Sequence, residues 1–584
     1  MEINIINQLN NKQKEAIEKI TGPSIILAGA GSGKTRVLVS KVINLIENHH
    51  VPQGSIIMIT FTNKAATEMK TRIKKYHLGF IGTFHSFCVR LLRIEGQAIG
   101  LKNNFLIYDD NDQIALVKLV IKKLNIGKRY TPAYFLNRIS GAKNMLISPL
   151  RYLELFKDSI SREIALVYNE YQQELKKTGA VDFDDLIMST VNLLGKNKDI
   201  LSKYQDKYRY ILVDEFQDTN YAQYVLTRML GKKYQNVTIV GDFSQSIYSW
   251  RGAEIKNLEK FKNDFSKVET FYLEENYRST QKILDFAYGV ISKNSTHPIL
   301  NLFTKKKGGE EISFFEAENE EEEAIYIATI IQNLNNIYKN HEIAILYRTN
   351  AQSRVIEEVF LHYGIPYVLI GGTRFYERKE IKDVLSYLRL LINPVDRISV
   401  ERVIKLGKRR WEDFKKFYEQ NKDTASDMET NQLIEKIFSA TKYLELYDEK
   451  DEDDFSRLEN IKELKSVALA FPSLTQFLEQ VALVESEYFE GEKKGQSQDA
   501  VKLMTLHQAK GLEFPVVFIA GVEEGILPHG RSVDDENSLE EERRLFYVGV
   551  TRAKQKLHIT YAKRRFIFGR RTEAVKSRFL DDMV

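Results

Sequence analysis

The segment that most constrains the fold of this chain is a glycine-rich loop, Ala28-Gly29-Ala30-Gly31-Ser32-Gly33-Lys34-Thr35. The apolar run 24–27 before it predicts a buried strand, and the apolar positions of 36–46 after it predict a helix packed on a sheet. A strand, a glycine loop and a helix together form a setting in which backbone N–H groups bind phosphate. Lys34 would reach the β- and γ-phosphates, and Thr35 would ligate Mg²⁺. The strict pattern has glycine where this chain has Ala28, so the loop alone also fits a tight strand-to-helix turn.

Length and composition restrict the class of protein. The 584 residues are too many for one core and predict about three to five domains. Cys88 is the only cysteine, which excludes intrachain disulfides and a cysteine-ligated zinc site and suits a reducing compartment. The N-terminus lacks a signal-like segment, and no apolar run approaches the roughly 20 residues that a spanning helix needs. We therefore expect a cytoplasmic protein with no membrane association.

An acidic pair follows another predicted buried strand. The strand 210–213 ends in Asp214 and Glu215, and the strand 237–240 leads to Gln245. Asp214 would bind Mg²⁺, Glu215 would orient or deprotonate an attacking water, and Gln245 would sense the γ-phosphate. A phosphate loop combined with an Asp-Glu pair indicates nucleotide hydrolysis.

Aromatic and polar residues follow several predicted strand ends, where ligands bind in open α/β sheets. These residues are Phe61, Asn63, His85, Phe183, Tyr248, Trp250 and Arg251. Rings and hydrogen-bonding groups together suit a nucleic-acid backbone with stacked bases. The structural alternatives are a buried histidine at 85, helix-capping acids around Phe183, and core aromatics elsewhere.

Nine segments, in a fixed order, identify a family. They are Gln13, Ala28–Thr35, Thr60–Met69, Thr83–Ser86, Asp214–Asp218, Gly241–Gly252, Glu275–Ser279, Lys510–Glu513 and Tyr547–Lys554. With these segments, which span nearly the whole chain, the sequence closely resembles the UvrD/PcrA/Rep group of superfamily 1 DNA helicases. The resemblance implies an α/β fold of two RecA-like P-loop NTPase motor domains with parallel sheets, each carrying a mainly helical insertion.

The implied domains alternate along the chain. The first motor domain would comprise 1–107 and 181–272, with the helical insertion 108–180 between them. The second would comprise 273–393 and 498–584, around a reduced helical accessory domain at 394–497. We expect a short form of the group, without the long C-terminal tail of many relatives.

The resemblance also assigns site residues. In the expected ATP site, Gln13 and Tyr277 would contact adenine, Glu513 would lie near the ribose, and Arg36 would follow the phosphate loop. Lys34, Glu215, Gln245, Arg278 and Arg552 would be catalytic, the two arginines acting on the γ-phosphate. The further DNA contacts implied are Arg348, Asn350, Thr505, His507 and Phe568.

The function that the resemblance implies is an ATP-dependent 3′-to-5′ DNA helicase or translocase in DNA repair or replication. It would use ATP and Mg²⁺ and act on single-stranded DNA and on 3′-tailed or forked duplexes. A translocase that displaces proteins with little unwinding is the first alternative, because the accessory domain is reduced. A non-enzymatic scaffold is the second, and the intact catalytic set argues against it.

Two charged segments have simpler interpretations. Glu320–Glu323 predicts a solvent-exposed helix start. The segment 563–571 is basic, contains aromatics and lacks acids, so it predicts a local contact surface for nucleic acid.

Overall fold

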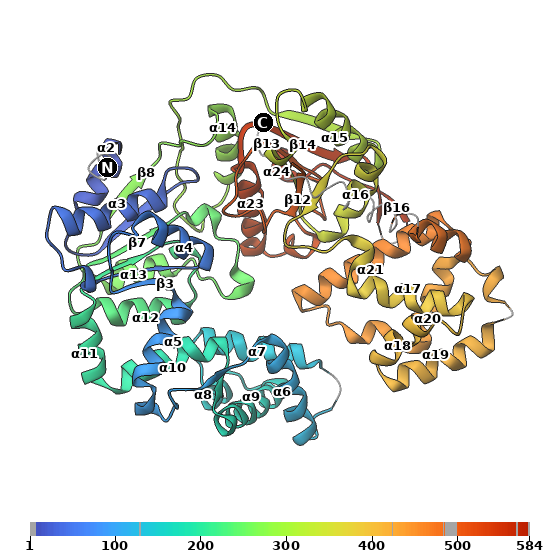
Figure 1. Cartoon of the computed structure of the whole chain (residues 1–584), viewed down its shortest axis with the longest axis horizontal. Coiled ribbons are helices and arrows are strands. Elements are labelled where there is room, and N and C mark those ends of the chain that lie inside the picture. The colour runs from blue at the N-terminus through green and yellow to red at the C-terminus, as the bar shows by residue number, and fades with distance from the viewer. Residues whose placement is uncertain are drawn as a thin grey trace. The chain divides into compact units, whose positions relative to one another are not determined.

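The computed structural model describes residues 8–127, 130–422, 424–482, 484, 499–567 and 570–581. The chain divides into two units (Figure 1). Unit 1 contains the residues up to Ser279 and the returning segment Asn294–Lys306; unit 2 contains Thr280–Lys293 and the residues from Lys307 onward. The sequence-based boundary at 273 lies at the last residue of a unit 1 strand. Within the described ranges, no helix is both long and apolar enough to cross a membrane.

Unit 1 is built on a six-stranded sheet in the order β3-β2-β6-β7-β1-β8, in which all neighbouring strands are parallel. The strands are β1 (Ser24–Ala28), β2 (Ile56–Thr60), β3 (Phe80–Thr83), β6 (Tyr210–Val213), β7 (Val237–Gly241) and β8 (Glu269–Leu273). The helices around it are α2 (Asn11–Glu18), α3 (Lys34–Glu47), α4 (Asn63–Arg72), α5 (Phe84–Glu95), α10 (Phe183–Lys196), α11 (Lys198–Lys207), α12 (Tyr221–Gly231) and α13 (Asn257–Asp264).

Strand β1 is buried along its whole length because both faces of this sheet are covered. Ile25 and Leu27 pack into a core with α5, α10, α12 and α13, whereas Ile26 and Ala28 pack into a second core with α2, α3 and α4. Alternate residues of one strand therefore anchor helices on opposite faces. The predicted strand before the glycine loop, the predicted helix after it and the predicted strand before the acidic pair are confirmed.

The insertion of unit 1 is helical, as predicted. It contains α6 (Asp110–Lys123), α7 (Pro132–Asn144), α8 (Pro149–Leu155) and α9 (Ser159–Thr178). Short parallel strands, β4 (Leu106–Ile107) and β5 (Ala180–Val181), pair where the chain enters and leaves it. The insertion has its own core, centred on Phe135, Tyr168 and Tyr171.

Unit 2 contains a second all-parallel six-stranded sheet, in the order β11-β12-β10-β13-β14-β9. The strands are β9 (Ser313–Ala317), β10 (Ile343–Tyr347), β11 (Tyr367–Leu369), β12 (Val501–Thr505), β13 (Phe514–Ile519) and β14 (Ala553–Ala562). The helices near the sheet are α14 (Gln281–Ile291), α15 (Glu320–Leu334), α16 (Ser353–His362), α23 (Glu536–Val550) and α24 (Arg578–Asp581). An antiparallel pair, β15 (Arg564–Ile567) and β16 (Arg570–Glu573), follows β14. Two parallel-sheet motor domains are thus confirmed.

The accessory region of unit 2 is also helical. Its helices are α18 (Arg397–Lys405), α19 (Lys408–Asn421), α20 (Thr430–Thr441) and α21 (Glu452–Ala470), and they pack with α17 (Lys379–Ile392), the helix directly before the region. They share a core that includes Leu388, Phe414 and Leu464. Polar contacts join this region to the motor part of the same unit: Arg354 Nε on α16 donates to Glu463 Oε1 on α21 at 2.7 Å.

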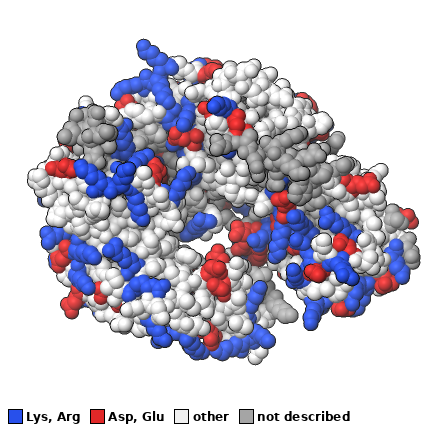
Figure 2. Space-filling model, viewed as in Figure 1, with Lys and Arg blue, Asp and Glu red and all other residues white. Residues whose placement is uncertain are grey.

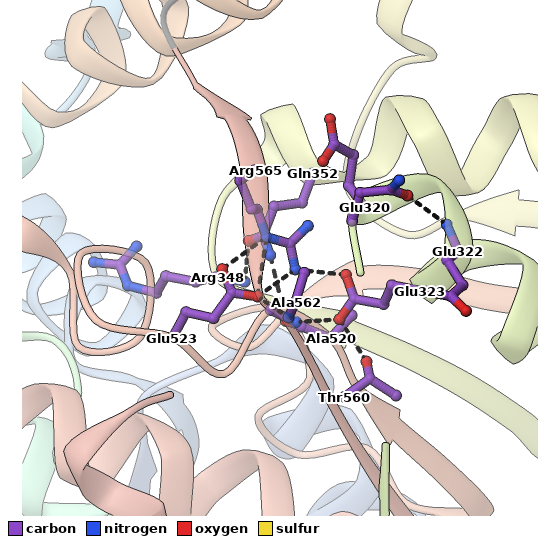
Figure 3. Close-up of polar contacts among 12 residues, drawn as sticks. Glu320, Glu322, Glu323, Arg348, Gln352, Ala520, Glu523, Thr560, Ala562 and Arg565 are labelled. Carbon is purple, nitrogen blue, oxygen red and sulfur yellow. Dashed lines mark hydrogen bonds and ion pairs between the residues drawn. The ribbon is translucent and has the colours of Figure 1, made fainter. Parts of the chain in front are cut away.

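A buried ionic cluster fixes the start of β15 within unit 2 (Figure 3). The Arg565 guanidinium donates to both carboxylate oxygens of Glu523, at 2.7–3.0 Å, and to Glu323 Oε2 at 2.5 Å. Glu323 accepts from the Thr560 hydroxyl at 2.6 Å, and Glu523 accepts from the Ala562 N–H at 2.7 Å. Burial raises the pKa of Glu523, and the guanidinium beside it opposes that shift. The cluster joins α15, the loop after β13 and the end of β14.

The cluster corrects two sequence-based expectations. Glu323 is not part of a fully exposed helix start, because it is 4% exposed and paired with Arg565. Arg565 is 8% exposed, so its charge is neutralised inside unit 2 and does not contribute to a nucleic-acid surface. Lys563 at the surface pairs with Glu318.

Replacing Arg565 with Met should destabilise unit 2. Removing the cation leaves two buried carboxylates without their partner, which costs about 3–5 kcal/mol. The chain has two tryptophans, Trp250 in unit 1 and Trp411 in unit 2. Urea unfolding followed by fluorescence in a Trp250→Phe background therefore reports on unit 2.

The neighbouring exposed residue provides the matched control for this measurement. Arg564→Met removes the same charge at the surface and should change the free energy of unfolding by less than about 0.5 kcal/mol. Equal losses for the two variants would contradict the role assigned to the cluster.

Candidate nucleotide site

The glycine loop leads directly into helix α3. Gly31 and Gly33 have φ values of 67° and 85°, in the left-handed region that glycine adopts without strain. Helix α3 begins at Lys34, so the N–H groups of its first turn lie at the loop. The Ser32 hydroxyl donates to the Gly29 carbonyl at 2.8 Å. This is the geometry in which a loop and a helix N-terminus bind an anion.

Two acids end the neighbouring strand β6. The Asp214 N–H donates to the Ile59 carbonyl of β2 at 2.8 Å, which fixes the carboxylate at the sheet edge. Glu215 has a φ of 49°, a conformation that is costly for glutamate and typical of functional positions. Burial, followed by the neighbouring Glu215, raises the pKa of Asp214 to about 7, and Lys34 acts in the opposite direction. The lysine of the loop therefore lies within electrostatic reach of the predicted metal ligand.

Two residues that the sequence analysis missed connect these strand ends. Gln217 Nε2 donates to Glu215 Oε2 at 2.6 Å, and Gln217 Oε1 accepts from the Asp242 N–H at 3.1 Å. Asp242 Oδ2 in turn accepts from Gln245 Nε2 at 2.6 Å. Burial raises the pKa of Asp242, and Lys34 opposes the shift. Gln217 and Asp242 lie in the segments Asp214–Asp218 and Gly241–Gly252, and membership of those segments is the only sequence signal that could have indicated them.

The donors at this edge fit a hard divalent cation. Asp214 Oδ1 is buried and has no hydrogen-bond partner, so a bound cation would satisfy it. Thr35 lies half-buried in the first turn of α3. Mg²⁺ is usually bound through one or two protein oxygens together with phosphate and water. Asp214 and Thr35 are therefore the residues that would hold Mg²⁺ at this site.

The predicted base-binding residues lie beside the loop in unit 1. Tyr277 is 43% exposed, and its hydroxyl accepts from Asn10 Nδ2 at 2.9 Å. Gln13 is buried: its amide donates to the Ser32 carbonyl at 2.9 Å and accepts from the Asn10 N–H at 3.1 Å. In this structure Gln13 thus attaches helix α2 to the loop rather than presenting both amide groups to a base. Arg36 donates to the Gln8 side chain.

The remaining candidates divide between the units. Arg278 lies in unit 1, with Lys34, Glu215 and Gln245. Arg552 lies in unit 2, where its buried guanidinium donates to the carbonyls of Val548 at 2.9 Å and Leu512 at 3.2 Å. Glu513 is exposed and pairs with Lys554 at 2.8 Å.

An aromatic cluster lies on the unit 1 loops. The Phe61 and Tyr248 rings are stacked, with centroids 5.9 Å apart and planes 13° apart. Trp250 packs edge-on to Tyr248, is 44% exposed, and has the Arg251 guanidinium 4.5 Å from its ring centre. These residues are not buried core aromatics, and Asn63 is exposed at the start of α4 nearby in sequence. Exposed rings beside a guanidinium can stack with bases.

A second aromatic pair lies at helix α10. Phe183 is 47% exposed, and its ring packs edge-on to His85 at 5.9 Å. Burial lowers the pKa of His85, which favours the neutral imidazole. Asp182 caps α10 by accepting from the Asp185 N–H at 2.8 Å. The acids thus cap the helix, and the phenylalanine beside them remains accessible.

A buried lysine supports this cap. Lys143 Nζ of α7 lies 2.6 Å from Asp182 and 2.9 Å from Asp185. The Tyr171 hydroxyl also donates to Asp182, at 2.9 Å. Burial opposes the ammonium of Lys143, but the two carboxylates outweigh it and raise its pKa. The network fixes the start of α10, and with it Phe183.

The neighbouring Asp184 should make unit 1 less stable as the pH rises. Burial, followed by Asp182, raises the pKa of Asp184 to about 7. An unfolded aspartate titrates near pH 4. Between these values the folded state binds more protons, so the free energy of unfolding falls as pH increases.

Asp184→Asn should reduce that slope, by up to about 1.4 kcal/mol per pH unit. The measurement is urea unfolding between pH 5 and pH 7.5 in a Trp411→Phe background, where Trp250 reports on unit 1. Asp110→Asn, at an exposed position of the helical insertion in the same unit, should leave the slope unchanged. An unaltered slope for Asp184→Asn would contradict the assignment.

Unit 2 contains the other predicted DNA contacts. Arg348 forms a bidentate pair with the Glu542 carboxylate, at 2.8–3.2 Å. Asn350 and His507 are half-buried, and Thr505 is 8% exposed at the end of β12. Phe568 lies outside the described residues. Figure 2 shows Lys and Arg side chains dispersed among acidic and neutral ones on the visible face, rather than gathered into one patch.

Known proteins match this chain along its length. The family model of the UvrD/REP helicase N-terminal domain matches residues 9–266, and that of the UvrD-like helicase C-terminal domain matches 271–428 and 407–564. The ATP-dependent DNA helicase PcrA of Bacillus subtilis (strain 168) is 41% identical over 99% of this chain and 86% of its own length. The PcrA proteins of Staphylococcus epidermidis (strain ATCC 35984) and Staphylococcus aureus (strain Mu50) are 40% and 41% identical, over 99% of this chain and 87% and 86% of their own lengths.

Proposed function

Because this chain belongs to the UvrD-like helicase family, we propose that it is an ATP-dependent DNA helicase that moves 3′ to 5′ on single-stranded DNA in repair or replication. The relatives named ATP-dependent DNA helicase PcrA support the activity. The observation that carries the proposal is that the C-terminal ends of the unit 1 strands combine a phosphate loop, an Asp-Glu pair and accessible stacking rings. In that pair Asp214 is buried and Glu215 half-buried, and the rings range from half-buried to exposed.

The proposed division of the chain follows the sequence-based domains. Residues 1–107 and 181–272 form the first motor domain, around the insertion 108–180. Residues 273–393 and 498–584 would form the second, around the accessory domain 394–497, with the difference that 274–279 and 294–306 pack within unit 1. The two parallel sheets and the two helical regions support this division.

The hydrolytic step would use residues at the sheet edge of unit 1. The loop N–H groups and Lys34 would bind the phosphates of ATP, and Glu215 would orient or deprotonate the attacking water. Gln217, bonded to Glu215, would orient that carboxylate, and Asp242 would orient Gln245. Mg²⁺, bound by Asp214 and Thr35, would neutralise charge on the phosphates.

The remaining residues would complete the ATP site and bind DNA. Arg278 and Arg552 would stabilise charge as the γ-phosphate leaves, and Tyr277 would stack on adenine. Single-stranded DNA, or the strand of a 3′-tailed or forked duplex, would stack on exposed rings and contact polar groups. Those residues are Phe61, Asn63, His85, Phe183, Tyr248, Trp250, Arg251, Arg348, Asn350, Thr505, His507 and Phe568. Arg348 is paired with Glu542 of helix α23, so this ion pair would need to open before the Arg348 guanidinium could contact a DNA phosphate.

Lys34→Ala should lower DNA-stimulated ATP hydrolysis by at least about 100-fold, because the transition-state charge loses its cation. Binding of a fluorescent single-stranded oligonucleotide should remain within about threefold of wild type. Lys232→Ala, at an exposed position of unit 1, is the control and should hydrolyse ATP normally. Undiminished hydrolysis by Lys34→Ala would refute the assignment of the site.

Trp250→Ala should weaken binding of single-stranded DNA by about tenfold, since stacking on one aromatic contributes about 1–3 kcal/mol. Hydrolysis in the absence of DNA should change little. Fluorescence anisotropy of a labelled oligonucleotide measures the effect, with Trp411→Phe in the accessory region as the control. Unchanged affinity would remove Trp250 from the proposed interface.

Unwinding and direction need a separate test. We expect ATP-dependent displacement of a strand from a 3′-tailed duplex and little displacement from a 5′-tailed one. Movement along single strands without displacement would instead support a protein-displacing translocase.

A further inference from the structure

The segment that follows β8 lies directly on the glycine loop. The Gly29 N–H donates to the Leu273 carbonyl at 3.2 Å, and the Tyr277 N–H donates to the Gly31 carbonyl at 3.0 Å. Asn276, between these contacts, is 1% exposed and has no assigned role in the proposed ATP site. Its position raises the question of what a buried amide does between the loop and Arg278.

The Asn276 side chain makes three hydrogen bonds. Its Nδ2 donates to the Ala30 carbonyl of the loop at 2.6 Å. Its Oδ1 accepts from the backbone N–H groups of Arg278 and Ser279, both at 2.7 Å. One amide therefore joins the phosphate loop to the backbone from which the Arg278 side chain extends. A buried amide bonded at both ends is held in a single orientation.

A second stretch of chain, the returning segment Asn294–Lys306, supports the other side of this backbone. The Asn276 N–H donates to the Phe303 carbonyl at 2.7 Å, and the Phe303 N–H donates to the Glu274 carbonyl at 3.1 Å. Lys306 Nζ donates to the Arg278 carbonyl at 2.6 Å. The backbone on both sides of Arg278 is thus fixed by groups that belong to unit 1.

The glycines of the loop make room for this arrangement. A Cβ atom at Gly31 would lie 2.7 Å from both Arg278 Cβ and Asn276 Nδ2. A Cβ atom at Gly29 would lie 2.3 Å from Leu302 Cδ2, in the returning segment. Such distances are shorter than packed atoms tolerate. Glycine is therefore needed in the loop for two reasons: its N–H groups must approach phosphate on one side, and Asn276, Arg278 and Leu302 leave no space for a Cβ atom on the other.

We propose that Asn276 is a positioning residue that fixes Arg278 against the phosphate loop, so that the arginine reaches the γ-phosphate when ATP is bound. The inference rests on the proposed function, and it assigns a role to a residue that touches neither ATP nor water in the proposed mechanism. A misplacement of about 1 Å in a catalytic group can reduce turnover by about 100-fold.

Asn276→Ala tests the proposal. The maximal rate of DNA-stimulated ATP hydrolysis should fall by about 10- to 100-fold, while the affinity for the fluorescent analogue mant-ATP changes by less than about threefold. Asn276→Asp keeps the acceptor for the two N–H groups but places an oxygen against the Ala30 carbonyl. Its maximal rate of DNA-stimulated ATP hydrolysis should therefore fall by a similar factor. Wild-type turnover by Asn276→Asp would overturn the proposal.

A matched control separates positioning from general stability. Asn44 is another buried asparagine of unit 1, whose Nδ2 donates to the Ile17 carbonyl at 3.0 Å far along α3 from the loop. Asn44→Ala should lower the thermal midpoint by an amount similar to Asn276→Ala, yet retain turnover within about twofold. Equal loss of turnover in the two variants would overturn the positioning role.

A double-mutant cycle with Arg278→Ala gives the sharpest result. If Asn276 acts through Arg278, the double variant should hydrolyse ATP within about twofold of Arg278→Ala alone. If instead the fold-losses in hydrolysis of the two single variants multiply in the double variant, Asn276 acts independently of Arg278, and the proposal is overturned. If the wild-type protein shows no DNA-stimulated hydrolysis, or does not bind mant-ATP, the proposed function itself is refuted. If the wild-type protein binds mant-ATP and hydrolyses ATP but the Asn276 variants do so equally well, only the positioning role is refuted.

Discussion

Steric crowding around the glycine loop is the constraint on which the rest of unit 1 depends. The loop must present N–H groups on one side, and it is packed on the other by the Asn276 side chain and by Leu302. The left-handed backbone of Gly33 then turns the chain into helix α3, so that Lys34 lies near the acids at the end of β6. A side chain at Gly29 or Gly31 would displace elements far from the loop in sequence.

Buried charges in this molecule lie in small networks that also fix chain segments. Lys143 neutralises the carboxylates that cap α10, and Arg565 neutralises those that connect α15 with the loop after β13. Each cation contacts two carboxylates, so loss of one partner would leave a charge in a poorly solvated interior. The networks therefore fix the positions of the start of α10 and of the loop after β13, where apolar packing alone would allow the chain other positions.

The sequence predicted those parts of the molecule that depend on local pattern. Strand β1, the loop and the acidic pair after β6 are recognisable because short runs of apolar residues and glycines determine them. Gln217, Asp242 and Asn276 were missed because their roles come from contacts between segments that are distant in sequence or from backbone geometry. The assumption that charged segments are exposed was wrong for Glu323 and Arg565. These two residues are buried partners separated by 242 positions in the sequence.

The path of the chain through residues 273–307 has a consequence for how the protein is made. Helix α14 belongs to unit 2, yet it lies in the sequence between two stretches of unit 1. Leu302, which packs on Gly29, is therefore synthesised about 270 residues after the loop that it covers. On the ribosome, the six-stranded sheet of unit 1 can be completed once β8 has emerged, but Leu302 can pack on the glycine loop only after helix α14 of unit 2 has emerged as well.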